Sequence, residues 1–140
     1  EEHTVYFSVV PTPQNGEPLA DGKIYRRDLW AGEPSEVATI RQSQVGGNWW
    51  GTFAIQDGTI YLTTLDTPSR IFKLTAAGPE PAFAANRAKI QGLAATADGA
   101  FYFADGTGII YKTNDFDAVE PALRSGRTMT DVAVQPDAAR

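Results

Sequence analysis

The sequence predicts an all-β protein, because apolar residues occur in short runs bounded by turn residues and because hairpin signals recur at a fixed spacing. No stretch of useful length shows the 3.6-residue apolar spacing of an amphipathic helix. Asp-Gly pairs at residues 57–58 and 98–99 each separate two apolar runs, and they lie 41 residues apart. Asp-Gly is a strong signal for a two-residue hairpin, since both central residues of a type I′ turn need a positive φ.

The similarity extends beyond the two hairpins. Residues 51–64 align with residues 92–105 at the 41-residue spacing, which pairs Tyr61 with Tyr102. A further copy begins at residues 131–137. Self-similarity at a period of about 40 residues predicts a protein built from structural repeats.

A second aligned set marks the third strand of each repeat. It consists of an isoleucine, an aromatic residue and a basic residue, and it occurs at residues 24–26, 71–73 and 110–112. Four strands in about 40 residues are typical of a propeller blade. The alternative is an irregular β-sandwich, in which strands follow one another without true repetition.

The expected strands make up three blades and the first strand of a further blade, all within one domain, residues 1–140. The first blade covers residues 4–41 and lacks its first strand, the next two cover residues 49–85 and 92–124, and residues 129–135 start another. Closed propellers need about four to eight blades. We therefore expect a six-bladed ring, either as a homodimer in which the spare strand completes the first blade of another copy or as part of a longer chain.

Residues 51–73 and 92–112 resemble the blades of six-bladed propellers built from NHL, YWTD or gluconolactonase-like repeats. The resemblance covers most of the chain and rests on hairpins followed by aromatic-rich strands. Gluconolactonase-like enzymes hold a central metal with acidic and amide side chains, so the resemblance also implies a lactonase- or lyase-type alternative. Residues 45–53 are similar to the Gly-Gly-Trp opening of tachylectin-like lectin blades, which implies a glycan ligand.

The ligand site is expected on the blade face that carries the longer loops, because binding residues concentrate on irregular loops held by a rigid scaffold. Two adjacent indoles in a strand point to opposite sides of the sheet. One tryptophan of this pair can therefore lie in the core while the other is exposed. The favoured interpretation is that both rings pack between neighbouring blades or beneath a loop, and the alternative is that they form a stacking platform for a sugar or an aromatic ligand. The candidate ligand-binding residues are Asn48, Trp49, Trp50, Asp66, Arg70 and Asp105.

Three aspartates, Asp66, Asp105 and Asp131, are candidate ligands for calcium if the ring brings them together. The favoured interpretation is structural: these side chains close turns by bonding to nearby backbone, and calcium binding is the alternative. The one histidine, His3, lies at the end of the chain and is poorly held for catalysis. No catalytic set is therefore assigned, and no cofactor is expected other than calcium as the alternative.

Composition limits the partners. The net charge of −5 and the pI of about 4.8 argue against binding to nucleic acid. No apolar run approaches the roughly 20 residues that span a bilayer. The absence of cysteine, the acidic balance and the blade type lead us to expect a periplasmic or secreted protein.

The sequence as a whole predicts a non-catalytic propeller module that presents a loop-rich face to a protein, peptide or glycan ligand. The less favoured alternative is a metal-dependent propeller enzyme of the lactonase or lyase type.

Overall fold

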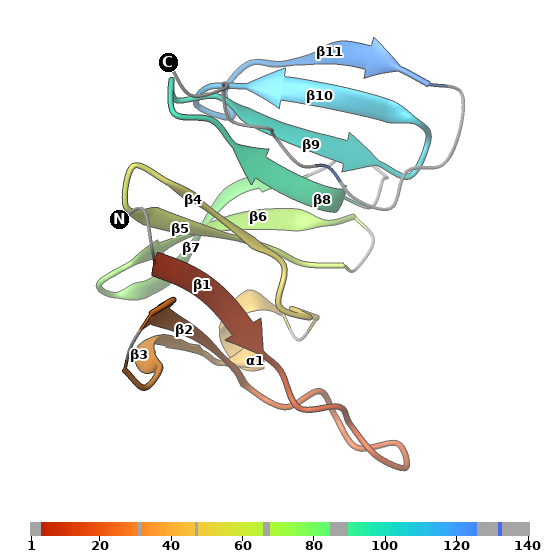
Figure 1. Ribbon diagram of the computed structural model, residues 1–140. Helices are drawn as coiled ribbons and strands as arrows, with labels where there is room; N and C mark the ends of the chain where they lie inside the picture. The colour runs from red at the N-terminus through yellow and green to blue at the C-terminus, as the bar shows by residue number, and fades with distance from the viewer. Residues whose placement is uncertain are drawn as a thin grey trace. The chain divides into compact units, whose positions relative to one another are not determined.

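The protein is all-β, as the computed structural model shows (Figure 1). The structure describes residues 4–30, 32–46, 48–65, 68–84, 90–125 and 132. Within these residues the strands form three antiparallel sheets, and one short helix is present. The all-β class is therefore confirmed. The chain divides into two compact units, Glu1–Gly51 and Thr52–Arg140, which are described separately.

The first unit contains a three-stranded sheet. Its strands follow in the order β1-β2-β3, and each pairs with the next along the chain. A short helix, α1, comes directly after β3. The bounds are Thr4–Val9 for β1, Gly22–Asp28 for β2, Ser35–Ile40 for β3 and Gln42–Val45 for α1.

The second unit contains two four-stranded sheets with the same simple meander. One sheet has the order β4-β5-β6-β7, and the other has the order β8-β9-β10-β11 when followed along the chain. The bounds in the first of these sheets are Phe53–Gln56, Thr59–Thr63, Arg70–Thr75 and Gly78–Ala84 for β4 to β7. The bounds in the other are Ile90–Ala95, Phe101–Asp105, Ile109–Thr113 and Val119–Arg124 for β8 to β11.

The pairing register shows that the three sheets are repeats of one unit. In each sheet a tyrosine lies opposite a basic residue on the neighbouring strand, and the next strand pair carries a β-bulge at the aligned isoleucine and aromatic residue. The tyrosine pairs are Tyr6 with Arg26, Tyr61 with Lys73 and Tyr102 with Lys112. The bulges fall at Ile24/Tyr25, Ile71/Phe72 and Ile110/Tyr111. Such repetition is compatible with propeller blades.

The first Asp-Gly hairpin forms as predicted. Asp57 has a φ of 49° and Gly58 a φ of 79°, so both residues have the positive φ of a type I′ turn. Gln56 pairs with Thr59 across this two-residue turn. The turn therefore joins β4 directly to β5.

The second Asp-Gly pair does not form a two-residue hairpin, so that prediction is wrong. Of the two residues, only Gly99 has a positive φ, 95°. The Thr96 amide donates to the Ala100 carbonyl at 2.8 Å, and the Thr96 hydroxyl accepts from the Ala100 amide at 3.1 Å. A side chain thus supports a wider turn, in keeping with the tendency of threonine hydroxyls to bond local backbone.

The wider turn also corrects the repeat alignment. Ala54 lies opposite Tyr61, and Ala94 lies opposite Tyr102. The tyrosines are 41 residues apart, but these alanines are 40 apart. The first strand of the repeat is therefore offset by one residue from the single-spacing alignment, because the second turn contains one more residue.

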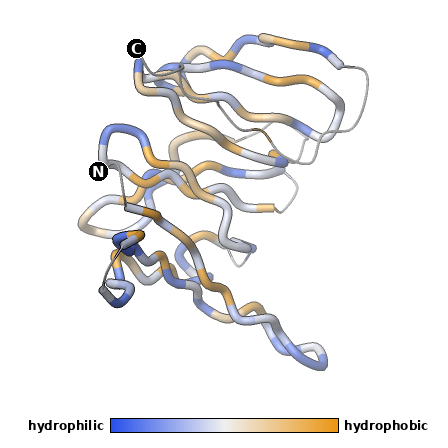
Figure 2. Tube along the Cα trace, in the orientation of Figure 1, coloured by the Kyte–Doolittle hydropathy of each residue, from blue (hydrophilic) through white to orange (hydrophobic). Residues whose placement is uncertain are grey.

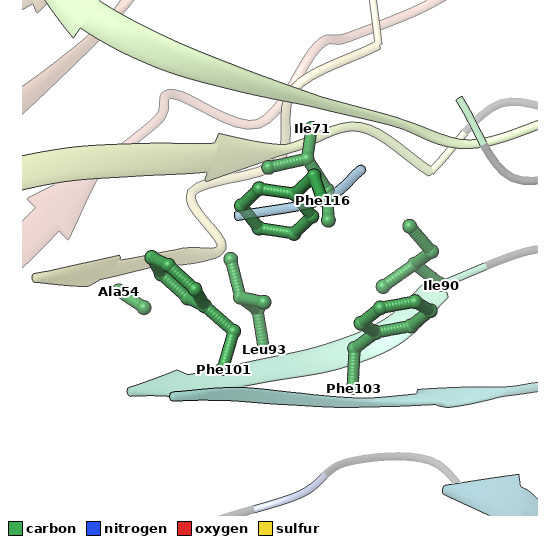
Figure 3. Close-up of a cluster of buried hydrophobic side chains, with 7 residues drawn as sticks. All are labelled: Ala54, Ile71, Ile90, Leu93, Phe101, Phe103 and Phe116. Carbon is green, nitrogen blue, oxygen red and sulfur yellow. The ribbon is translucent and has the colours of Figure 1, made fainter. Parts of the chain in front are cut away.

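The core of the second unit lies between its two sheets. β4 and β5 pack against β8 there, and Tyr61 of one sheet contacts Phe101 of the other, which in turn contacts Phe116 of its own sheet. Ring centroids lie 4.6 Å apart for Tyr61 and Phe101, and 4.8 Å apart for Phe101 and Phe116. The buried cluster consists of Ala54, Ile71, Ile90, Leu93, Phe101, Phe103 and Phe116 (Figure 3). None of the helices within the described residues has the length and apolar character needed to cross a membrane.

Candidate functional site

Two long connections meet at one end of the first sheet. One joins β1 to β2 through residues 10–21, and the other follows β3 through residues 41–51 and contains α1. The connection through residues 10–21 has a tight turn at its tip. Asn15 and Gly16 both have a positive φ there, and the Glu17 amide donates to the Gln14 carbonyl at 2.9 Å. Figure 2 shows that the tip of this loop is hydrophilic. The ligand site was predicted on the longer loops, and these two connections are long.

A buried glutamine joins the two connections. The Nε2 of Gln42 donates to the Ala20 carbonyl at 3.0 Å and to the Trp49 carbonyl at 2.7 Å. Its Oε1 accepts a hydrogen bond from the Trp49 backbone amide at 2.9 Å. The backbone amide of Gln42 donates to Asp21 Oδ1 at 2.9 Å. One side chain therefore satisfies backbone groups on both loops. The sequence analysis missed Gln42, since nothing local distinguishes it from a surface glutamine.

Trp49 is part of the core of the first unit. Its side chain is fully buried and packs directly over the backbone of Gly22. A Cβ added at Gly22 would lie 2.7 Å from the Trp49 indole and 2.6 Å from the Val10 side chain. Glycine is therefore needed at position 22 because two side chains approach its Cα closely.

Trp50 lies at the surface, with 49% of its area exposed, and its neighbour Asn48 is also exposed. The structure buries one indole and exposes the other, so the favoured prediction that both rings pack internally is wrong for Trp50. The prediction that both lie in a strand is wrong, because β4 begins at Phe53. The hydrogen bonds of Gln42 to Trp49, rather than a strand pleat, set the two orientations.

The residue after Trp50 is also fixed. Gly51 has a φ of 103°, which favours glycine, and its carbonyl accepts a 2.7 Å hydrogen bond from the Ser8 hydroxyl on β1. A Cβ at this position would lie 2.6 Å from the Ser8 oxygen. Trp50 is thus an exposed indole between two anchored residues.

Asp105 closes the turn after β9. Its Oδ1 accepts from the Thr107 amide at 2.9 Å and from the Thr107 hydroxyl at 2.6 Å. Burial raises the pKa of Asp105, but hydrogen bonds from Thr107 and Tyr111 outweigh this effect and hold the pKa below its ordinary value. The carboxylate is buried within its own loop. This geometry matches the turn-closing interpretation and makes Asp105 a structural residue.

We expect Asp105→Asn to destabilise the protein at neutral pH by about 1–3 kcal/mol, because charged hydrogen bonds are lost. A depressed folded-state pKa contributes stability above the unfolded-state pKa, and this contribution is lost as pH falls through the folded-state pKa. Urea unfolding at pH 7 and at pH 3 should therefore show a difference from the natural protein that shrinks on acidification. Asp117→Asn makes the same change at an exposed position and is the control. A pH-independent difference would contradict the assignment.

The remaining candidates divide between the units. Arg70, at the start of β6, places its guanidinium carbon 5.4 Å from the centroid of the Phe72 ring, which is cation–π geometry.

Asp66 and Asp131 lie outside the described residues, as does His3. Within the described part of the chain, no group of three histidine or acidic side chains is placed to hold a metal ion. Asn48, Trp49 and Trp50 are in the first unit, and Arg70 and Asp105 are in the second.

Comparison with known proteins adds no relative: no protein-family model matches the chain, and no curated protein matches its sequence. What the structure itself supports is an all-β fold of three antiparallel sheets, each with three or four strands, compatible with propeller blades.

Proposed function

We propose that the protein is a non-catalytic binding module whose first unit presents Trp50 and the surrounding loops to a protein or peptide ligand. The observation that supports this proposal is that the indole of Trp50 is half-exposed although the residues on both sides of it are held in place. Tryptophan offers a large contact area with an apolar face and a polar edge, and it is enriched among the residues that dominate binding energy.

The anchoring of the segment supports this proposal. Trp49 is buried over Gly22, and the Gly51 carbonyl is bonded to Ser8. A side chain on a fixed backbone loses less conformational freedom on binding than one on a free loop, so more of its contact energy appears as affinity. Exposed Asn48 lies two positions before Trp50 and supplies amide groups that can bond a peptide backbone.

A peptide or protein is preferred to a glycan because the Trp-Trp feature occurs in one repeat only. Tachylectin-like lectins carry their motif in every blade. A glycan ligand is the alternative for the same surface.

The proposal includes a ring built from these sheets. The common tyrosine pairs support repeated, blade-like sheets, and the sequence resemblance suggests blades of the NHL, YWTD or gluconolactonase-like kind. Three such blades would form half of a six-bladed ring, which a second copy or the remainder of a longer chain would complete.

The binding proposal is tested by Trp50→Ala. A peptide selected on the natural protein from a displayed random library should bind this variant at least about 30-fold more weakly, since hot-spot truncations cost about 2 kcal/mol or more. Trp30→Ala is the matched control, because Trp30 is an exposed indole in the β2–β3 turn. Isothermal titration calorimetry measures both affinities.

Equal affinities for the natural protein and Trp50→Ala would contradict the proposal, as would an equal loss in Trp30→Ala. The same proteins applied to a glycan array test the alternative. Glycan binding that disappears in Trp50→Ala alone would identify a lectin.

A further inference from the structure

The connection between β1 and β2 extends beyond the first sheet and carries an asparagine-glycine pair at its tip (Figure 1). The φ of Asn15 is 47° and that of Gly16 is 80°, and the Glu17 amide donates to the Gln14 carbonyl at 2.9 Å. This is a type I′ turn, in which both central residues have a positive φ. Asn15 and Gly16 are both exposed. The pair therefore lies in solvent, in a turn closed by one backbone hydrogen bond.

The surrounding protein holds neither the Asn15 side chain nor the Gly16 amide. Among the described residues, neither of these groups takes part in a hydrogen bond. A Cβ added at Gly16 would have no atom within 4 Å, so the space beside this residue is open. Water and base therefore reach both groups, and nothing but the turn itself fixes their relative position.

We propose that Asn15 is a site of spontaneous deamidation, which converts it to aspartate and isoaspartate. The Gly16 nitrogen loses its proton to hydroxide and attacks Asn15 Cγ. The new bond joins this nitrogen to Cγ, the bond from Cγ to Nδ2 breaks, and the amide group takes a proton from water and leaves as ammonia. Water then opens the resulting succinimide. Addition at Cγ gives aspartate, and addition at the main-chain carbonyl gives isoaspartate, so water is the only co-reactant.

The other asparagines of the described residues lack this combination. Asn48 is exposed, but the amide that would attack it belongs to Trp49 and donates to Gln42 Oε1 at 2.9 Å. The Nδ2 of Asn114 donates to the Gly99 carbonyl at 3.3 Å. Exposure alone therefore does not select the reactive residue. A free side chain followed by a free glycine amide does.

Opening of the turn sets the rate. The Gly16 nitrogen approaches Asn15 Cγ only when the backbone leaves the turn conformation, so the rate follows the population of the locally open form. One hydrogen bond closes this turn, and the net effect of such a bond on an equilibrium is about two- to tenfold. The folded protein should therefore react within about tenfold of the rate of the unfolded chain.

The modification changes the charge and the backbone at the tip of this connection. Either product carries a carboxylate, which is ionised at neutral pH. Isoaspartate also adds one methylene group to the main chain, so the two-residue turn is lost. The sheet should be unaffected, because the far end of the connection is held separately, where Gln42 Nε2 donates to the Ala20 carbonyl.

The experiment incubates the natural protein at pH 8, both folded and in urea, and takes samples over time. Ion-exchange chromatography separates the more acidic product, and peptide mapping by mass spectrometry locates the exchange of NH2 for OH. An isoaspartyl methyltransferase with S-adenosylmethionine detects the isoaspartate. When half of Asn15 in the folded protein has reacted, Asn48 and Asn114 should be intact, and the circular dichroism of the acidic form should match that of the starting protein.

Gly16→Ala is the control variant, because its methyl group hinders the approach of the nitrogen to Cγ. Its Asn15 should react several-fold more slowly in urea, where the fold of the variant does not matter. Three results would overturn the proposal: a folded protein that reacts far below the tenfold limit, equal reaction at Asn48, or an equal rate in Gly16→Ala. None of these measurements involves Trp50, so their failure is distinguishable from failure of the binding proposal.

Discussion

Trp49→Ala is expected to lower the free energy of unfolding by about 3–5 kcal/mol, the cost of truncating a large buried side chain. The indole is fully buried and lies over Gly22, which has no side chain to fill the space, so its removal leaves a cavity. Urea or guanidinium unfolding followed by far-ultraviolet circular dichroism measures the change, with the slope m checked for constancy.

The neighbouring variant Trp50→Ala is the matched control. It removes the same side chain from an exposed position, and surface substitutions away from special features usually change stability by about 0.5 kcal/mol or less. Trp49→Ala should thus act on stability and Trp50→Ala on binding. Similar losses of stability in both variants would show that the burial difference is wrong.

Phe101→Ala should be as costly, about 3–5 kcal/mol, because it removes the ring at the centre of the buried cluster in the second unit. The ring lies tilted against Phe116 of its own sheet (Figure 3). It is also T-shaped to Tyr61 of the other sheet, so contacts to both sheets are lost. Calorimetric or chemical unfolding measures this loss.

Leu123→Ala is the control for the second unit. Leu123 lies on β11 and is largely exposed, so the expected change is small. A loss as large as that of Phe101→Ala would mean that the outer strand, rather than the interface between the sheets, carries the core.

Strand positions were predictable because turn chemistry and short apolar runs are local properties of the chain. Asp57-Gly58 favours a type I′ turn between two strands, and the structure has that turn. The same dipeptide at residues 98–99 did not, because the Thr96 hydroxyl bonds the backbone of Ala100 and stabilises a wider loop. A side chain two positions away was sufficient to change the turn.

The candidate site was predicted on the longer loops, but the contacts that build it were not. The structure brings the connections through residues 10–21 and 41–51 into contact through Gln42. The role of Asp105 depended on partners in its own turn, and composition alone could not choose between a turn and a ligand site.

The sequence by itself determined the all-β class, the threefold repetition and the positions of the long loops, since these depend on periodicity and on turn residues close together in the chain. The tertiary structure decided which indole is buried, that Gln42 joins two loops and that Gly22 must lack a side chain. Each of these depends on contact between distant residues, such as Gly22 with Trp49. Burial belongs to the packed chain, and no local pattern specifies it.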